Sequence, residues 1–145
     1  MYRVYVKNYD DEYPLHEPVD DMMRIFSPVL TQEMGAAGTF SFQIHADHPN
    51  YNQLKVLESE IVVYDNDEAI FVGRMAKPAT DFYGMESVTC EGDLAYLLDS
   101  QQRPYIYTGS IIDFVNQMLD THNGQVEARK QFLPGRITVV DSNDY

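Results

Sequence analysis

The only cysteine, Cys90, lies in the stretch SVTCEGDLAYLLDS and is the first candidate for chemistry. A cysteine acts as a nucleophile when a nearby base or cation favours its thiolate. Its neighbours here are Glu91 and Asp93, whose negative charges disfavour the thiolate. We therefore predict that Cys90 is a buried, inert packing residue, because unpaired cysteine is among the most buried residue types.

A metal site is the second chemistry that the residue types suggest. The segment HADHP holds His45, Asp47 and His48, but zinc needs three or four convergent ligands and no further cluster supplies them. The segment DNDE (Asp65–Glu68) looks like the start of a calcium loop, yet its sixth position is Ile70 instead of glycine. We expect a solvated turn and a hairpin turn, and neither a metal nor another cofactor.

Paired carboxylates are the third possibility, since a glycosidase needs only two at the right separation. The acidic residues fall in predicted turns and at helix ends, where solvation and the helix dipole explain them. A Gly-x-Ser-x-Gly motif and a phosphate-loop glycine spacing are both missing from the sequence. We predict no catalytic, cofactor-binding or metal-binding residue, and a hydrolase acting through scattered carboxylates stays open as an alternative.

The elements that must position these residues are mostly strands. Alternating apolar and polar residues predict strands, and turn residues between two of them predict antiparallel hairpins. One hairpin closes at GAAG (Gly35–Gly38) and a second at DNDE, where aspartate and asparagine favour the turn. The strands are expected at Tyr2–Lys7, Val29–Met34, Thr39–Ala46, Glu60–Tyr64, Ala69–Met75 and Met85–Glu91.

The stretch IFVGRM shows what this alternation implies for an arginine beside apolar residues. Phe71 and Gly73 should face one side of the strand, and Val72 and Arg74 the other. Arg74 is therefore predicted to be a surface or interface pairing group, and not a catalytic cation. A glycine within a strand also indicates a bulge or a close approach of another backbone.

Two helices are predicted after the last of these strands. Asp93 is a suitable N-cap for a helix of about two turns over residues 94–98. Thr108 or Ser110 begins a second helix, over about 110–122, which Asn123-Gly124 ends. Ser110, with Asp113 three residues later, resembles a capping box. A strand is expected at about 137–141.

The longer helix carries a broad apolar stripe that another element must cover. The residues after it are too few to close a second core, so we expect the native polypeptide to continue beyond residue 145. The stripe consists of Ile111, Ile112, Phe114, Val115, Met118 and Leu119.

The composition indicates a globular and strongly acidic protein. The 145 residues have a formal net charge of −13, of which residues 1–70 carry −9 and residues 71–145 carry −4. The sequence has no basic stripe to neutralise phosphates, so it does not indicate ordinary nucleic-acid binding. An acidic wall that repels a DNA backbone is physically possible. No segment approaches the ~20 apolar residues of a membrane span.

The order of motifs carries a resemblance. A Phe-Ser-Phe hairpin, a His-Pro-x-Tyr turn, an FVGR strand, the step CEGDLAYLLDS and a helix ending in His-Asn follow one another from Val29 to Asp141. This order closely resembles the N-terminal region of phage and prophage tail-tip proteins. That family is variously called minor structural protein, tail-associated lysin or prophage endopeptidase tail protein.

The resemblance implies an α+β, mainly β fold like that of contractile-phage baseplate hub proteins. A barrel-like antiparallel tube domain with a short helix would cover residues 1–104, and a mixed α/β domain would begin at residues 105–145. It also implies a structural, non-enzymatic role in a virion tail tip, with any peptidase or wall-hydrolase activity in later domains. The protein would be made in the bacterial host cytoplasm from a phage or prophage gene.

The implied partners are those of a hub. The full-length protein would be a homotrimer whose ring contacts the distal tail protein ring and the tape measure protein. DNA would pass through it without sequence-specific binding, and this segment would contact no membrane. The interface candidates are Arg74, Tyr96 and Phe114. Besides a cell-wall hydrolase, a carbohydrate- or receptor-binding β-module that uses its tyrosines is an open alternative.

Overall fold

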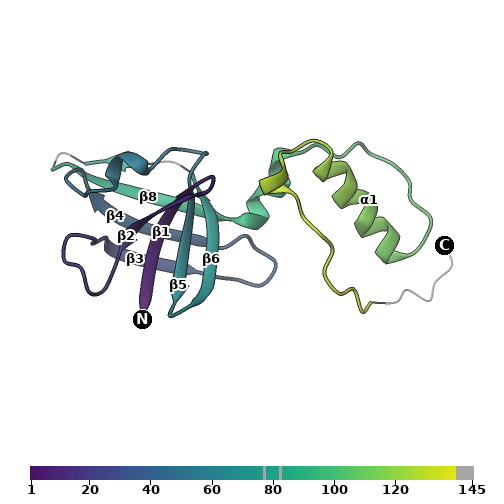
Figure 1. Ribbon diagram of the computed structural model, residues 1–145. Helices are drawn as coiled ribbons and strands as arrows, with labels where there is room; N and C mark the ends of the chain where they lie inside the picture. Colours follow the sequence, from purple (N-terminus) through teal and green to yellow (C-terminus); the bar gives the residue numbers. More distant parts are fainter. Residues whose placement is uncertain (77, 82, 140–145) are drawn as a thin grey trace. The chain divides into compact units, whose positions relative to one another are not determined.

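The computed structural model describes residues 1–76, 78–81 and 83–139 (Figure 1). The chain divides into two units, Met1–Leu94 and Ala95–Tyr145, and each unit is described by itself. The domain boundary expected after residue 104 stays a prediction, as does the assignment of residues 105–145 to a mixed α/β domain.

The first unit is an antiparallel sheet. Its strands pair in the order β2-β1-β5-β6-β8-β4-β3, and the short β7 also pairs with β8 (Figure 1). Both predicted hairpins are present, as the ladders β3–β4 and β5–β6. The strands are β1 (Tyr2–Asn8), β2 (Asp11–His16), β3 (Phe26–Thr31), β4 (Thr39–His45), β5 (Glu60–Asp65), β6 (Glu68–Met75), β7 (Ala79–Thr80) and β8 (Met85–Gly92).

The predicted fold class, mainly antiparallel β with a short helix, is confirmed, but the sheet does not close. Strands β2 and β3 are the two ends of the pairing order, and no ladder joins them in the part of the chain that the structure describes. Each edge strand contains a proline, Pro14 in β2 and Pro28 in β3, which has no backbone N–H to donate. Proline is typical of edge strands, where it discourages further strand pairing.

The sheet bends where β6 meets β8. The β6–β8 ladder has only the pairs Gly73 with Gly92, Arg74 with Glu91 and Met75 with Cys90. A Cβ atom added to Gly73 would lie 2.3 Å from the carbonyl oxygen of Glu91, so the close backbone approach predicted for this glycine is present. Residues on both sides of this short junction, from β1, β5 and β6 and from β4 and β8, contribute to one shared interior.

One apolar core fills that interior. Alternate residues of β1, β4, β5, β6 and β8 point into it, as the period of two predicts. The core consists of Val4, Val6, Leu15, Ile25, Phe40, Phe42, Ile44, Ile61, Val63, Phe71, Met75, Val88 and Cys90.

The second unit contains the α-helix α1 (Ile111–Asn123). Ser110 is its N-cap as predicted, because the Asp113 amide donates to the Ser110 hydroxyl at 3.2 Å. The helix expected over 94–98 is instead the 3-10 helix η2 (Asp93–Asp99), and two further 3-10 turns are η1 (Tyr51–Gln53) and η3 (Ala128–Lys130). Among the described residues, no helix is long and apolar enough to cross a membrane.

Two predictions for the segments before and after α1, the cap at Asp93 and the strand at 137–141, differ from the structure. Asp93 is the first residue of η2 and not its N-cap, and its Oδ1 is buried without a hydrogen-bond partner among the described residues. Residues 137–139 form no strand, so that part of the predicted strand at 137–141 is wrong. Residues 140 and 141 of the same prediction lie outside the described residues.

Candidate interaction surface

Cys90 is a core residue. Its side chain is fully buried in β8, and burial raises the pKa of the thiol to about 12. A thiol with that pKa carries almost no thiolate at neutral pH, so nothing in its surroundings activates it as a nucleophile. The prediction of a buried packing residue is confirmed.

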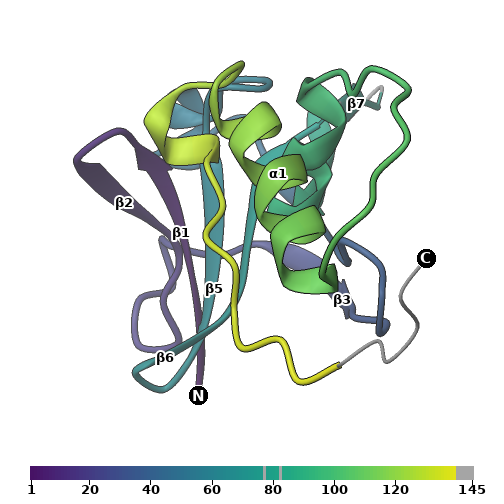
Figure 2. The same ribbon diagram turned by 90° about the vertical axis from the view of Figure 1, so that its right-hand side faces the viewer.

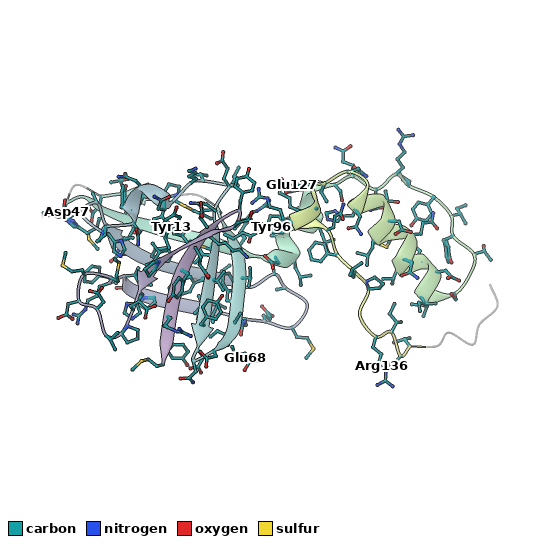
Figure 3. All side chains as sticks on the ribbon, viewed as in Figure 1. Tyr13, Asp47, Glu68, Tyr96, Glu127 and Arg136 are labelled. Carbon is teal, nitrogen blue, oxygen red and sulfur yellow. The ribbon has the colours of Figure 1, made fainter. Side chains whose placement is uncertain are left out.

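The HADHP segment does not converge on one point. His45 Nδ1 lies 3.3 Å from Asp47 at the exposed end of β4, where Figure 3 labels Asp47. His48 is buried instead: its Nε2 donates to the Leu15 carbonyl at 3.0 Å, and its Nδ1 accepts from the Asn50 amide at 3.1 Å. Burial lowers the pKa of His48, which keeps it neutral. His48 therefore holds the turn after β4 against the edge strand β2.

Asp93, near Glu60, is a carboxyl group in a perturbed environment. Burial, and then the negative charge of Glu60, raise the pKa of Asp93 to about 6. A carboxyl that titrates near neutrality beside a second carboxylate is the arrangement found in acid–base pairs. Two acidic side chains that are close together for purely structural reasons show the same raised pKa. The pair is therefore a candidate catalytic site, and its pKa alone does not establish catalysis.

Arg74 is engaged within its own chain. Its Nη2 lies 3.3 Å from Glu91 Oε2, directly across the β6–β8 ladder, and its side chain is only 13 % exposed. Arg74 thus has an ion-pair partner, Glu91, within its own chain. Whether it also contributes to an interface stays a prediction.

The two other interface candidates belong to the second unit. Tyr96 in η2 is buried, and Lys130 Nζ lies 5.5 Å from the centre of its ring, a cation–π distance. Phe114 in α1 is 37 % exposed, and its ring centre lies 5.3 Å from that of Tyr107 and 6.2 Å from that of Tyr105. Of the three candidates, Phe114 is therefore the most available to a partner.

The apolar stripe of α1 stays largely uncovered within its unit. The only buried side chain of the helix α1 is His122, which is not part of the stripe. Its Nδ1 lies 2.7 Å from Ser100 Oγ, and its Nε2 lies 3.0 Å from the Lys130 carbonyl oxygen. His122 thus ties the helix to the segments before and after it, whereas the stripe residues Ile112, Phe114 and Met118 are exposed.

Sequence reasoning missed an apolar cleft in the first unit. It has a volume of about 440 Å³ and lies along the edge strands β2 and β3, with β1, β4, β5 and β6 contributing its remaining walls. Six of its lining residues are apolar side chains of the core and its margin: Val4, Ile25, Leu30, Phe40, Val63 and Ile70. The single proline in each edge strand, Pro14 and Pro28, is a sequence signal that points to an open seam there.

No protein-family model matches the chain, and no curated protein matches it in sequence. Among solved structures, the 43 kDa tail protein of prophage MuSo2 from Shewanella oneidensis is similar in fold. Its TM-score is 0.51 at 14 % identity, over 84 % of this chain. A tail protein from Neisseria meningitidis MC58 matches 80 % of this chain with a TM-score of 0.48 at 12 % identity. The chain spans 39 % and 32 % of the length of these two proteins. The antiparallel sheet described above is therefore a fold that this chain shares with a prophage tail protein.

Proposed function

We propose that this chain is a structural component of a phage or prophage tail. The observation that carries the proposal is the similarity of its fold to a prophage tail protein over 84 % of its length. The order of motifs from Val29 to Asp141, which resembles tail-tip proteins, supports the same function independently of the structure. The exposed apolar side chains of α1 are also typical of a protein that works within an assembly.

Within a tail, we place the chain in a trimeric hub at the tip. The strongest physical support is charge, since residues 1–94 hold 17 acidic against 6 basic residues, a formal charge of −11. A ring of such units around a lumen would repel the DNA backbone and let it slide through without being gripped. The distal tail protein ring and the tape measure protein are the partners proposed for the two sides of this hub.

Immunoelectron microscopy tests the location. Antibodies raised against this chain should label tailed particles at the distal end of the tail only. Label spread along the tail would refute the hub and retain a tail function, and unlabelled particles would refute both. Native mass spectrometry of the complete protein that contains this chain should give a trimer, whereas a strict monomer would refute the ring.

The second candidate, a cell-wall hydrolase, is favoured by one observation, the raised pKa of Asp93 beside Glu60. We propose that this pair is structural and that the chain has no enzymatic activity of its own. A turbidity assay on purified cell walls decides between the two. Lysis by the 145-residue chain that is abolished in Asp93→Asn and Glu60→Gln would establish the hydrolase and overturn the structural function.

A further inference from the structure

Two extended segments flank α1 within the second unit. The first flank (residues 101–108) leads toward the helix and the second flank (residues 132–139) follows η3, and neither forms a helix or a strand. Figures 1 and 2 both show the chain running away along the first flank, returning through α1 and running away again along the second flank. The two flanks therefore run in the same direction, opposite to α1, as the strands of a strand–helix–strand unit do.

A side-chain carboxamide holds the first residue of each flank. The Gln101 amide donates to Gln125 Oε1 at 3.0 Å, and Gln125 Nε2 donates to the Gln101 carbonyl at 3.0 Å. The Phe132 amide donates to Asn123 Oδ1 at 2.9 Å, and Asn123 Nδ2 donates to the Phe132 carbonyl at 2.8 Å. Each carboxamide thus binds both backbone groups of one residue, as a neighbouring strand would. Because Asn123 is the last residue of α1, these bonds fix the start of the second flank at the end of the helix.

Beyond these two residues, the backbone of both flanks is unpaired. Among the described residues, the backbone groups of residues 102–108 and 133–139 make no hydrogen bond with another backbone group. Both segments nevertheless contain aromatic and β-branched residues that favour strands, Tyr105-Ile106-Tyr107 in the first and Ile137-Thr138-Val139 in the second. Strand-forming residues with free backbone donors and acceptors are the template to which an added strand pairs.

Alternate side chains of the first flank already pack on α1. The ring centres of Tyr105 and Tyr107 lie 6.2 Å and 5.3 Å from that of Phe114, whereas Ile106 between them is 98 % exposed. This alternation is that of a strand with one face on a helix. A hollow of about 280 Å³ lies where this flank meets α1, and it can accept an aliphatic side chain. The hollow is lined by Gln102, Arg103, Pro104, Tyr105, Phe114 and Met118.

The arginines of the two flanks have no acidic partner. Arg103, which lines the hollow, and Arg136 in the second flank make no ion pair among the described residues, although the chain has 23 acidic residues. A strand that binds here therefore gains an ion pair if it carries Asp or Glu. A flank of a second copy is disfavoured as the occupant, since these two arginines are the only charged residues of the flanks and like charges would meet.

We propose that the second unit binds an extended strand of a partner protein between its two flanks. The strand pairs with the free backbone groups of both flanks, directs alternate aliphatic side chains toward α1 and carries an acidic residue that reaches Arg103. The pairing supplies the ladder that residues 137–139 lack, and the aliphatic side chains cover the exposed Phe114 and Met118. This proposal rests on contacts within the second unit, and not on the tail function.

The test measures amide hydrogen exchange by NMR in the 145-residue chain with three synthetic peptides. The first is acetyl-Thr-Val-Glu-Val-Thr-Val-Thr-amide, and the second has Lys in place of Glu. The third is the first peptide N-methylated at its three central residues, which removes donors on both edges. At about 10 times its dissociation constant, the first peptide should slow the exchange of alternate amides within 105–107 and 137–139 about 10-fold. The Lys peptide should bind about 5-fold more weakly, and the N-methylated peptide should protect neither flank.

Two matched pairs of variants locate the site. Arg103→Glu should weaken the Glu peptide and strengthen the Lys peptide, about 5-fold each, whereas Lys55→Glu in the first unit should change neither. Met118→Asn removes an apolar residue of the hollow and should weaken the Glu peptide about 5-fold. Gln117→Asn changes its exposed neighbour on α1, outside the lining, and should leave binding unchanged. The Arg103 and Lys55 pair keeps the test valid if Met118→Asn unfolds the helix, since both side chains are exposed.

Each opposite outcome overturns the proposal. Unchanged exchange with the Glu peptide at millimolar concentration refutes strand binding, and protection of one flank alone refutes insertion between them. Protection by the N-methylated peptide would show docking through side chains, and equal binding of the Lys peptide refutes the acidic strand. Protection without peptide that rises with protein concentration would identify a second copy, whereas protection at every concentration would show that the flanks pair with each other. Protection in the complete protein that contains this chain, without a partner, would identify a strand of the same polypeptide.

Discussion

Gly92→Ala should be the most damaging single-methyl change in the first unit. A Cβ at this position would lie 1.7 Å from the Ala37 carbonyl oxygen and 2.9 Å from its carbonyl carbon. Ala37 belongs to the β3–β4 turn, whose neighbouring Gly38 carbonyl accepts a 3.1 Å hydrogen bond from the Gly92 amide. Because the obstacle is backbone on both sides, no rotation of a side chain relieves the clash.

The expected loss follows from two effects. Ordinary contacts of a Cβ begin at 3.4 Å, so the turn and β8 must separate far enough to break their hydrogen bond. Overpacking costs about 1–3 kcal/mol or more, and losing the buried bond adds about 1 kcal/mol. We expect a loss of about 3 kcal/mol, which for a unit of this size lowers Tm by about 12–24 °C.

Circular dichroism during thermal and urea unfolding measures this loss against two control variants. Gly135→Ala meets no atom within 4 Å and has no positive φ, so its Tm should stay at the wild-type value. Gly35→Ala also meets open space, but its φ of 79° should cost about 1 kcal/mol. If the Gly92→Ala protein has the same Tm and the same urea midpoint as the Gly135→Ala variant, the close packing of the β3–β4 turn on β8 is refuted.

Three further predictions concern titratable side chains. The folded pKa of Asp93 is raised, so its ionisation destabilises the unit as the pH rises from about 4 through about 6. Asp93→Asn should therefore raise the free energy of unfolding at pH 8, by about 1 kcal/mol once partial exposure is allowed for, and leave it unchanged at pH 4; equal effects at both pH values would contradict the raised pKa. Cys90 should react with Ellman's reagent only after denaturation, because its thiol is buried and its pKa is about 12; rapid reaction of the native protein would contradict this burial. His48→Ala should lose about 2 kcal/mol, since two buried backbone groups lose their partner, while His45→Ala at the exposed strand end should lose little. Urea unfolding that ranks the two histidines equally would refute the structural role of His48.

The sequence by itself determined most of the strands and the long helix. The alternation in TFSFQIHA and AIFVGRM predicted β4 and β6 correctly, since a period of two is a local property of an extended chain. The cap at Ser110 was also predictable, because Asp113 is only three residues away. Local hydrogen bonding and local side-chain direction are sufficient for these elements.

Short segments and charge environments needed the tertiary structure. Residues 94–98 are too few to distinguish an α-helix from a 3-10 helix by periodicity, and η2 begins directly after Gly92, whose backbone is packed against Ala37. The pKa of Asp93 is raised first by burial and then by Glu60, which lies 33 positions earlier in the sequence, and both are set by the tertiary structure. Asp93 appeared to be a cap because nothing local revealed this neighbour.

The apolar cleft was decided by the tertiary structure alone. Its walls come from six strands, among them β2 and β3, the two ends of the pairing order, which do not pair with each other among the described residues. Gly73 and Gly92 likewise meet only through the pairing of β6 with β8, and a Cβ on either would clash with a backbone carbonyl. Periodicity along the chain shows which side of a strand is apolar, but only the pairing of distant strands shows where an apolar surface is left open.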